Sequence, residues 1–316
     1  MGIRPRSRER GAMDENTTRT AVPAGSIVVG VDGSDCAAQA VAWAADQAVL
    51  ESRRLVLLHA ADSMSTTTSM WLTSMAVDPT EVRRDIEAGG RDLLARTAAE
   101  LGTSHPSVEL VEVLQQVDPR LALIEASAVA HTTVVGSHGR GPVSGLLLGS
   151  VGVAVARHAK GPVVVVRPGS PNDAPRHGVI VGVDGTERSL PALEAAYRHA
   201  SVRRLPLTVV HCFWDVIAAT TPGHIVPSAG ADTEDLRRLV GESVAGMSEK
   251  FPDVPVTIEL ARGLAEEVLG RESAEHDLVV VGHHRTGPVT ALLRGSVSTA
   301  VVEHATCPVL VVPSTD

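Results

Sequence analysis

The chain has 316 residues, more than one domain usually holds, so two domains are expected. Its net charge of −9 at pH 7 argues against nucleic acid as a partner, because proteins that bind phosphate backbones carry clustered Lys and Arg. No apolar stretch reaches the roughly 20 residues that cross a bilayer, and three cysteines without metal-ligand spacing favour reduced thiols. We therefore expect a cytoplasmic protein that binds no membrane.

The first 25 residues are basic and polar and have little to bury. Residues 1–25 are therefore predicted to form a disordered segment, in which Met13 is an alternative start to Met1.

From residue 26 onward, short apolar runs alternate with longer segments that carry apolar residues at helical spacing. Strands are predicted at 26–32, 54–60, 107–114, 132–136 and 162–167, and helices at 37–50, 79–101, 119–130 and 150–158. The run from Leu55 to Leu58 is apolar at every position, which indicates a strand buried on both faces. The pattern predicts an α/β, Rossmann-like domain: a five-stranded parallel sheet with helices on both faces.

Two segments fit neither pattern. Residues 62–77 and 215–233 each follow a second strand and are predicted to be mobile loops. Their Met and Trp side chains could line a pocket or a partner surface, but we expect them to fold back onto their own domain.

The sequence contains an internal repeat. SIVVGVDGS at 26–34 recurs as GVIVGVDGT at 178–186, and the segment at 132–166 returns with substitutions at 277–312. The Pro-rich, polar residues 168–177 have the composition of a linker. The chain is therefore predicted to hold two tandem domains of the same fold, at 26–167 and 178–313.

Ligands of open parallel sheets bind beyond the carboxyl ends of the strands, and Asp32 lies at such an end. Its carboxylate could accept hydrogen bonds from ribose hydroxyls or help to hold a metal. The other interpretation makes Asp32 or Ser34 the N-cap of the following helix. The sequence alone leaves both open.

The segment from Gly136 to Ser150, GSHGRGPVSGLLLGS, joins the fourth strand to a helix. Glycines let the backbone approach an anion closely, and the helix that starts after Gly149 offers unpaired N–H groups and a positive dipole end. This arrangement suits phosphates. The second copy keeps Gly282, Gly295 and Ser296 at the same spacing.

Histidines lie at two places in these motifs. His59 and His211 end the second strand of each copy, where main-chain groups could contact an adenine edge; we expect both side chains to be structural. His283 and His284 are adjacent but lack further ligands nearby in the sequence, so no metal site is expected there.

With these motifs the sequence resembles the universal stress protein family in its tandem, ATP-binding form. The family's signature is G-x-x-G, nine residues, then G-S or G-T, and Gly136, Gly139, Gly149 and Ser150 match it. The resemblance covers nearly all of residues 26–313. It implies an ATP-binding regulatory protein of the stress response, with ATP held with or without Mg²⁺, and protein partners that are unknown. It also implies that the closing strands of the two domains pack together and that homodimers form.

The same resemblance assigns the residues of two sites. The first consists of Asp32, the main chain of Ala60, Gly136, Gly139, Gly149, Ser150 and Val151. The second consists of Asp184, Cys212, Gly282, Gly295, Ser296 and Val297. Arg285 stands where the second copy should have its second glycine. A side chain there is strained if φ is positive, although arginine can also bond to phosphates. We expect unequal sites, with the first the stronger.

No dedicated catalytic set is visible. The chain has no G-x-x-x-x-G-K-[ST] loop, and residues 136–150 and 282–296 contain no lysine, so at most slow ATP hydrolysis is expected. The alternatives are an adenylate-transferring enzyme of the same fold and a dinucleotide-dependent oxidoreductase. The second fits poorly, because dinucleotide folds place their glycine-rich loop after the first strand.

Overall fold

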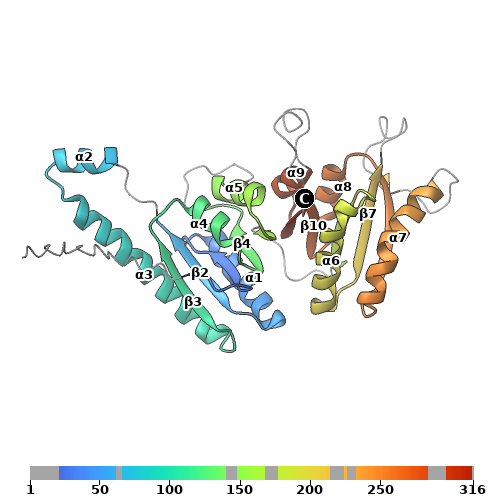
Figure 1. Cartoon of the computed structure of the whole chain (residues 1–316), viewed down its shortest axis with the longest axis horizontal. Helices are drawn as coiled ribbons and strands as arrows, with labels where there is room; N and C mark the ends of the chain where they lie inside the picture. The colour runs from blue at the N-terminus through green and yellow to red at the C-terminus, as the bar shows by residue number, and fades with distance from the viewer. Residues whose placement is uncertain are drawn as a thin grey trace, which may run out of the picture.

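The computed structural model describes residues 21–61, 66–139, 148–167, 177–213, 224–225, 233–283 and 297–314. They form two α/β repeats that lie side by side (Figure 1). The first repeat contains β1 (Ile27–Gly30), α1 (Asp35–Glu51), β2 (Leu55–Ala60), α2 (Thr66–Ser74), α3 (Pro79–Ser104), β3 (Leu110–Gln115), α4 (Pro119–Ala126), β4 (Thr132–Gly136), α5 (Ser150–His158) and β5 (Val163–Val166). The second contains β6 (Val179–Val183), a 3₁₀ turn η1 (Glu187–Ser189), α6 (Leu190–Arg203), β7 (Leu207–Phe213), β8 (His224–Ile225), α7 (Glu234–Lys250), β9 (Val256–Arg262), α8 (Ala265–Glu272), β10 (Leu278–His283), α9 (Val297–His304) and β11 (Val309–Pro313).

The strands form one 11-stranded sheet in the order β3-β2-β1-β4-β5-β11-β10-β6-β7-β9-β8. Within each repeat the five main strands are parallel, as predicted, and only the two-residue β8 runs antiparallel to its neighbour β9. Successive residues of a strand point to opposite faces, so Ile27 and Val29 join one core and Val28 joins the other. Helices α1, α3, α6 and α7 contribute to the first core, and α4, α5, α8 and α9 to the second.

The two repeats join through their closing strands. β5 and β11 pair antiparallel, with Val164 opposite Leu310, which confirms the predicted packing of these strands. Pairing covers two apolar edges that would otherwise be open to other chains. A homodimer would therefore have to use another surface.

Polar side chains also form hydrogen bonds between the two repeats, from α6 to α1. Arg203 donates from Nε and Nη2 to Gln47 Oε1 at 3.0 and 2.7 Å, and Gln47 Nε2 donates to Glu51 Oε1 at 2.5 Å. His131 Nε2 lies 2.9 Å from Glu51 Oε2. The ring of His199 lies 6.2 Å from that of Trp43. Because a buried polar group is costly unless it is paired, these contacts favour one arrangement of α1 against α6.

The segment at 62–77 differs from its prediction. Residues 66–74 form helix α2, which projects beyond the sheet in Figure 1. Its Met70 and Trp71 side chains, and Met75 just after it, are 69%, 59% and 59% exposed, so they do not fold back onto their domain. The segment contains no Gly or Pro before Pro79, and nothing in it interrupts a helix. Of its counterpart at 215–233, only residues 224–225 and 233 are described.

The N-terminal boundary also differs from its prediction. Gly25 N donates to Val129 O at 2.8 Å, and Val22 packs against the core, so residues 21–25 belong to the folded repeat. Most of the predicted disordered segment, residues 1–20, lies outside the described residues. The same holds for most of the predicted linker, residues 168–176. Within the described part of the chain, no helix has both the length and the apolar character needed to cross a membrane.

Candidate functional site

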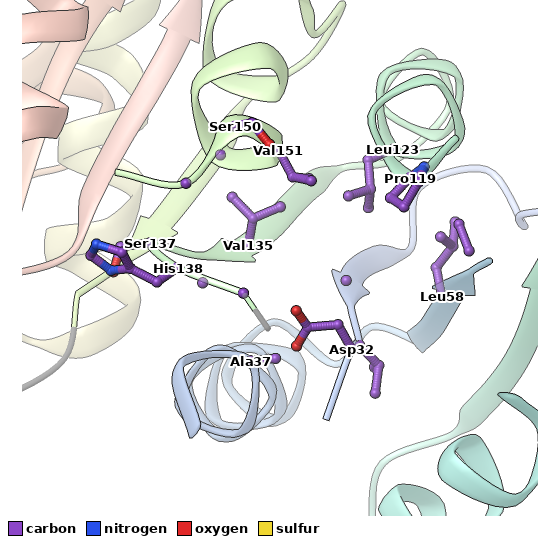
Figure 2. A pocket seen from close by; sticks show the side chains of 17 residues that line it. Asp32, Ala37, Leu58, Pro119, Leu123, Val135, Ser137, His138, Ser150 and Val151 are labelled. Carbon is purple, nitrogen blue, oxygen red and sulfur yellow. The ribbon is translucent and has the colours of Figure 1, made fainter. Parts of the chain in front are cut away.

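A cavity of about 410 Å³ opens at the carboxyl ends of β1 and β4 (Figure 2). In the strand order β3-β2-β1-β4-β5, the chain builds the sheet to one side of β1 and then returns to build the other side from β4. Such a reversal leaves a crevice between the two strands, where α/β sheets of this kind bind ligands.

All seven residues predicted for the first site line this one cavity. They are Asp32, Ala60, Gly136, Gly139, Gly149, Ser150 and Val151. The structure adds an apolar lining that sequence reasoning missed: Leu58, Pro119, Leu123 and Val135. Leu58 and Val135 lie near strand ends, and Pro119 starts α4. These positions in the sequence place them at the carboxyl edge of the sheet and could have predicted that they line the cavity.

Hydrogen bonds at the start of α1 decide between the two interpretations of Asp32. Ala37 N donates to Ser34 Oγ at 3.2 Å, so Ser34 is the N-cap of α1. Ser34 N and Oγ donate to Asp32 Oδ1 at 2.9 and 2.7 Å. Among the described residues no donor contacts Asp32 Oδ2, and Figure 2 shows the carboxylate facing the cavity. Asp32 therefore presents one carboxylate oxygen to the cavity.

The cap can be tested by replacing Ser34 with alanine. Loss of the N-cap is expected to lower the free energy of unfolding by about 1 kcal/mol, whereas Ser34→Thr should lose only a fraction of that, because threonine also caps helices. Urea unfolding of the three proteins measures the difference. Equal stability of the Ser34→Ala variant and the wild type would contradict the capping role.

Lack of space requires glycine at two of the three motif positions, Gly136 and Gly139, and makes the third, Gly149, a tight fit. A Cβ on Gly136 would lie 2.8 Å from the backbone carbonyl of Cys36, and one on Gly139 would lie 2.6 Å from Asp32 Oδ2. A Cβ on Gly149 would lie 3.3 Å from Ser137 O. None of the three has a positive φ. The left-handed conformation considered for the second glycine of the motif is therefore wrong for Gly139, and close approach to Asp32 is the reason for its glycine.

The start of α5 lies across the cavity from Asp32 in Figure 2. Its N-cap is Gly149, which has no side chain to accept a hydrogen bond from the first turn. The first N–H groups of the helix are therefore left for another acceptor, at the end of the helix where the dipole favours negative charge. An anion is the ligand that this geometry suits.

The two strand-end histidines are structural, as predicted. His59 Nδ1 lies 2.6 Å from Val31 O, and His211 Nδ1 lies 3.0 Å from Val183 O. Each ring thus bridges a strand to the end of its neighbour. A Cβ on Gly90 of α3 would lie 2.9 Å from the His59 ring, which shows how closely the helix packs on it.

The second predicted site is only partly described. Asp184 follows β6, Cys212 lies in β7, Gly282 in β10 and Val297 at the start of α9, while Gly295, Ser296 and Arg285 lie outside the described residues. β6 pairs with β10 as β1 pairs with β4, so these residues lie at the equivalent carboxyl edge of the sheet. Burial raises the pKa of the Cys212 thiol to about 12, so this side chain stays neutral near pH 7.

The universal stress protein family model matches residues 24–167 and 176–313. The chain belongs to the universal stress protein family. A universal stress protein of Mycolicibacterium smegmatis is 34% identical over 292 residues, covering 90% of this chain and 96% of the relative. One of Mycobacterium tuberculosis is 34% identical over 295 residues, covering 90% and 95%. The resemblance found in the sequence is thereby confirmed, in the tandem form.

The fold agrees with a solved structure. The crystal structure of a universal stress protein from Archaeoglobus fulgidus matches with a TM-score of 0.67 at 20% identity, over 93% of this chain and 98% of that one. At this identity the match supports the tandem α/β architecture alone.

Proposed function

We propose that the first repeat of this universal stress protein binds ATP, and that its occupancy changes how the chain contacts other proteins in the stress response. One observation carries the proposal: a single cavity gathers the carboxylate of Asp32, Ala60 and the motif residues from Gly136 to Val151. Residues so far apart in the sequence converge at the point where sheets of this kind bind nucleotides.

The parts of ATP match the parts of the cavity. The apolar side chains of Leu58, Pro119 and Leu123 offer a surface for adenine beside the main chain of Ala60. Asp32 Oδ2 can accept hydrogen bonds from the ribose hydroxyls. Gly139 and Gly149 allow the phosphates to approach the backbone and the start of α5.

Mg²⁺ would reach this site together with the phosphates. Asp32 is the one acidic side chain among the described residues that line the cavity, and the described part of the chain holds no cluster of three His, Cys, Asp or Glu side chains that could bind a metal ion. Mg²⁺ commonly uses one carboxylate together with substrate phosphates, so Asp32 fits as its single protein ligand. The ion would neutralise phosphate charge there.

The proposed role is regulatory, with slow hydrolysis at most. Asp32 is the acidic group that faces the cavity, and Ser34 holds its other oxygen, so it is placed to bind and orient. Protein partners and a homodimer remain predictions from the family resemblance. A ligand that copurifies would discriminate the alternatives: ATP or AMP favours this proposal, whereas NAD would favour an oxidoreductase.

Calorimetric titration of the full chain with ATP tests the proposal. We expect wild-type binding, and a loss of about tenfold or more in Asp32→Asn, because a hydrogen bond to a charged group contributes about 1.5–3 kcal/mol. Asparagine keeps the oxygen that accepts from Ser34. The matched control is Asp35→Asn, which makes the same charge change at an exposed position of α1 and should bind like wild type. Absence of ATP binding by the wild-type chain would refute the proposal.

A further inference from the structure

The first repeat carries a longer helix than its counterpart in the second. α3 has 26 residues, whereas α7, the equivalent helix, has 17. The two helices end alike, at the C-caps His105 and Phe251, which share one backbone conformation. The additional residues therefore lie at the start of α3, and in Figure 1 this start projects beyond the sheet together with α2. We call residues 66–90, which span α2 and the start of α3, the arm.

The arm presents apolar side chains to solvent. Met70, Trp71 and Met75 are exposed, and so is Ile86 on α3. The first buried residue of α3 is Gly90, so the helix makes its contacts with the core only after the arm. Residues 66–77 include no charged side chain. Exposed apolar side chains that gather in this way mark a surface that binds another protein surface.

The same repeat contains an apolar groove. A cavity of about 440 Å³ lies between α1 and α3, a size typical of binding sites, and the structure describes every residue that lines it. Its apolar lining includes Ala38, Val41 and Ala42 of α1 and Leu93 and Leu101 of α3. The charged residues of the lining are Asp35, Arg96 and Glu100; all three are exposed, which places them at the rim.

The second repeat has larger side chains between the equivalent helices, α6 and α7. Where α1 has Ala38 and Ala42, α6 has Leu190 and Glu194, and Lys250 Nζ of α7 donates to Glu194 Oε1 at 2.8 Å. Where α1 has Ala45, α6 has Tyr197, and its ring stacks on that of Phe251 with centroids 5.7 Å apart. The second repeat thus joins these helices with its own side chains. The alanines of the first repeat leave room for an apolar group from elsewhere.

We propose that the arm of one copy of this chain packs on a second copy and places Met70 and Trp71 in the groove between α1 and α3. Within one chain α2 lies beyond the start of α3, and about 20 Å of helix separates Pro79 from Leu93, where the groove begins. The occupant is therefore the arm of another copy.

Charge and symmetry fit this occupant. Because residues 66–77 carry no charge, their insertion buries none, while Arg96 and Glu100 stay at the rim. A two-fold axis lets each copy fill the groove of the other, as in most homodimers. The closing strands β5 and β11 pair within the chain and take no part in this interface.

Analytical ultracentrifugation of the full chain over a range of protein concentrations tests the proposal. We expect a dimer. Trp71→Gln should raise its dissociation constant at least about tenfold, because a tryptophan held in an interface pocket is commonly among the residues that contribute most to binding. The matched control, Leu121→Gln, replaces a leucine that is 58% exposed on α4, a helix of the other core, and should leave the constant unchanged.

Ala38→Leu tests the groove itself. Leucine is the residue of the second repeat at this position; it takes up the space of the groove and should raise the dissociation constant about tenfold as well. The control Gln39→Leu puts the same side chain at the next position of α1, which is exposed and does not line the groove. Thermal unfolding checks that each variant folds. Because Trp71→Gln and Ala38→Leu remove one contact, the double variant should dissociate no more readily than either single variant.

Each other result overturns the proposal. A wild-type chain that stays monomeric at all concentrations would show that the arm does not bind a second copy. A dimer that tolerates both Trp71→Gln and Ala38→Leu would use another surface. A dimer weakened by only one of them, or weakened additively in the double variant, would show that the arm and the groove do not meet.

Discussion

Replacing Gly139 with alanine is expected to weaken ATP binding by the full chain by about tenfold to a hundredfold while the fold survives. The added Cβ would lie 2.6 Å from Asp32 Oδ2, the oxygen that faces the cavity. The carboxylate cannot turn away freely, because Ser34 holds its other oxygen through two hydrogen bonds. Displacing it costs the hydrogen bonds that it would make to ribose, and each such bond to a charged group contributes about 1.5–3 kcal/mol.

The matched control for this substitution is Gly102→Ala on α3. A Cβ there has no neighbour within 4 Å, and alanine is the better helix former, so binding should be unchanged and stability equal or slightly higher. Calorimetric titration gives the affinities, and thermal unfolding checks that both variants fold. Wild-type affinity in Gly139→Ala would show that the close approach of Gly139 to Asp32 does not matter for the ligand.

The first site could be predicted from the sequence because its signals are local. The spacing of Gly136, Gly139 and Gly149 and their place after an apolar strand predict, without any knowledge of distant contacts, that they lie together at the carboxyl edge of the sheet, where all three line one cavity. The role of Asp32 could not be decided in this way, since aspartate and serine are both good N-caps. Only the hydrogen bond from Ala37 N to Ser34 Oγ assigns the cap and leaves Asp32 for the cavity.

The same difference between local and distant signals explains which parts of the fold could be predicted from the sequence. Apolar runs such as Leu55 to Leu58 predicted buried parallel strands correctly, because each run is complete within a few residues. Helix α2 was missed because its Thr-rich sequence has no clear apolar face. The contacts of Arg203 with Gln47 and the hydroxyl of Ser189 on Asp184 carry no signal in the sequence, since they depend on where the second repeat and its 3₁₀ turn lie.

Acidification from pH 7 to 4 is expected to destabilise the folded chain by about 3 kcal/mol through His199. Burial lowers the pKa of this imidazole from 6.5 to about 4, and its Nδ1 has no hydrogen-bond partner among the described residues. Between those pH values the unfolded chain binds a proton that the folded chain excludes. The contribution of His199 to the free energy of unfolding is therefore fully present above pH 6.5 and is lost as the pH falls to 4.

Glu51, which belongs to the polar contacts between α1 and α6, causes a second loss of folding stability at lower pH. Burial disfavours its charge, but hydrogen bonds from His131 and Gln47 outweigh that effect and lower its pKa from 4.5 to about 2. Its stabilising contribution is present above pH 4.5 and is lost as the pH falls toward 2. The windows of His199 and Glu51 barely overlap, so the loss between pH 6.5 and 4.5 can be assigned to the histidine.

Urea unfolding at a series of pH values, with the variant His199→Leu, isolates that loss. Leucine is close to histidine in size and cannot bind a proton, so the variant should lose less stability than wild type between pH 6.5 and 4.5. The control His177→Leu removes a histidine whose side chain is 64% exposed, and it should keep the wild-type dependence on pH. If His199→Leu follows the wild-type curve, the acid sensitivity originates elsewhere. If it flattens the curve, the buried imidazole of His199, which packs beside Trp43 of α1, is the group through which acid destabilises the fold.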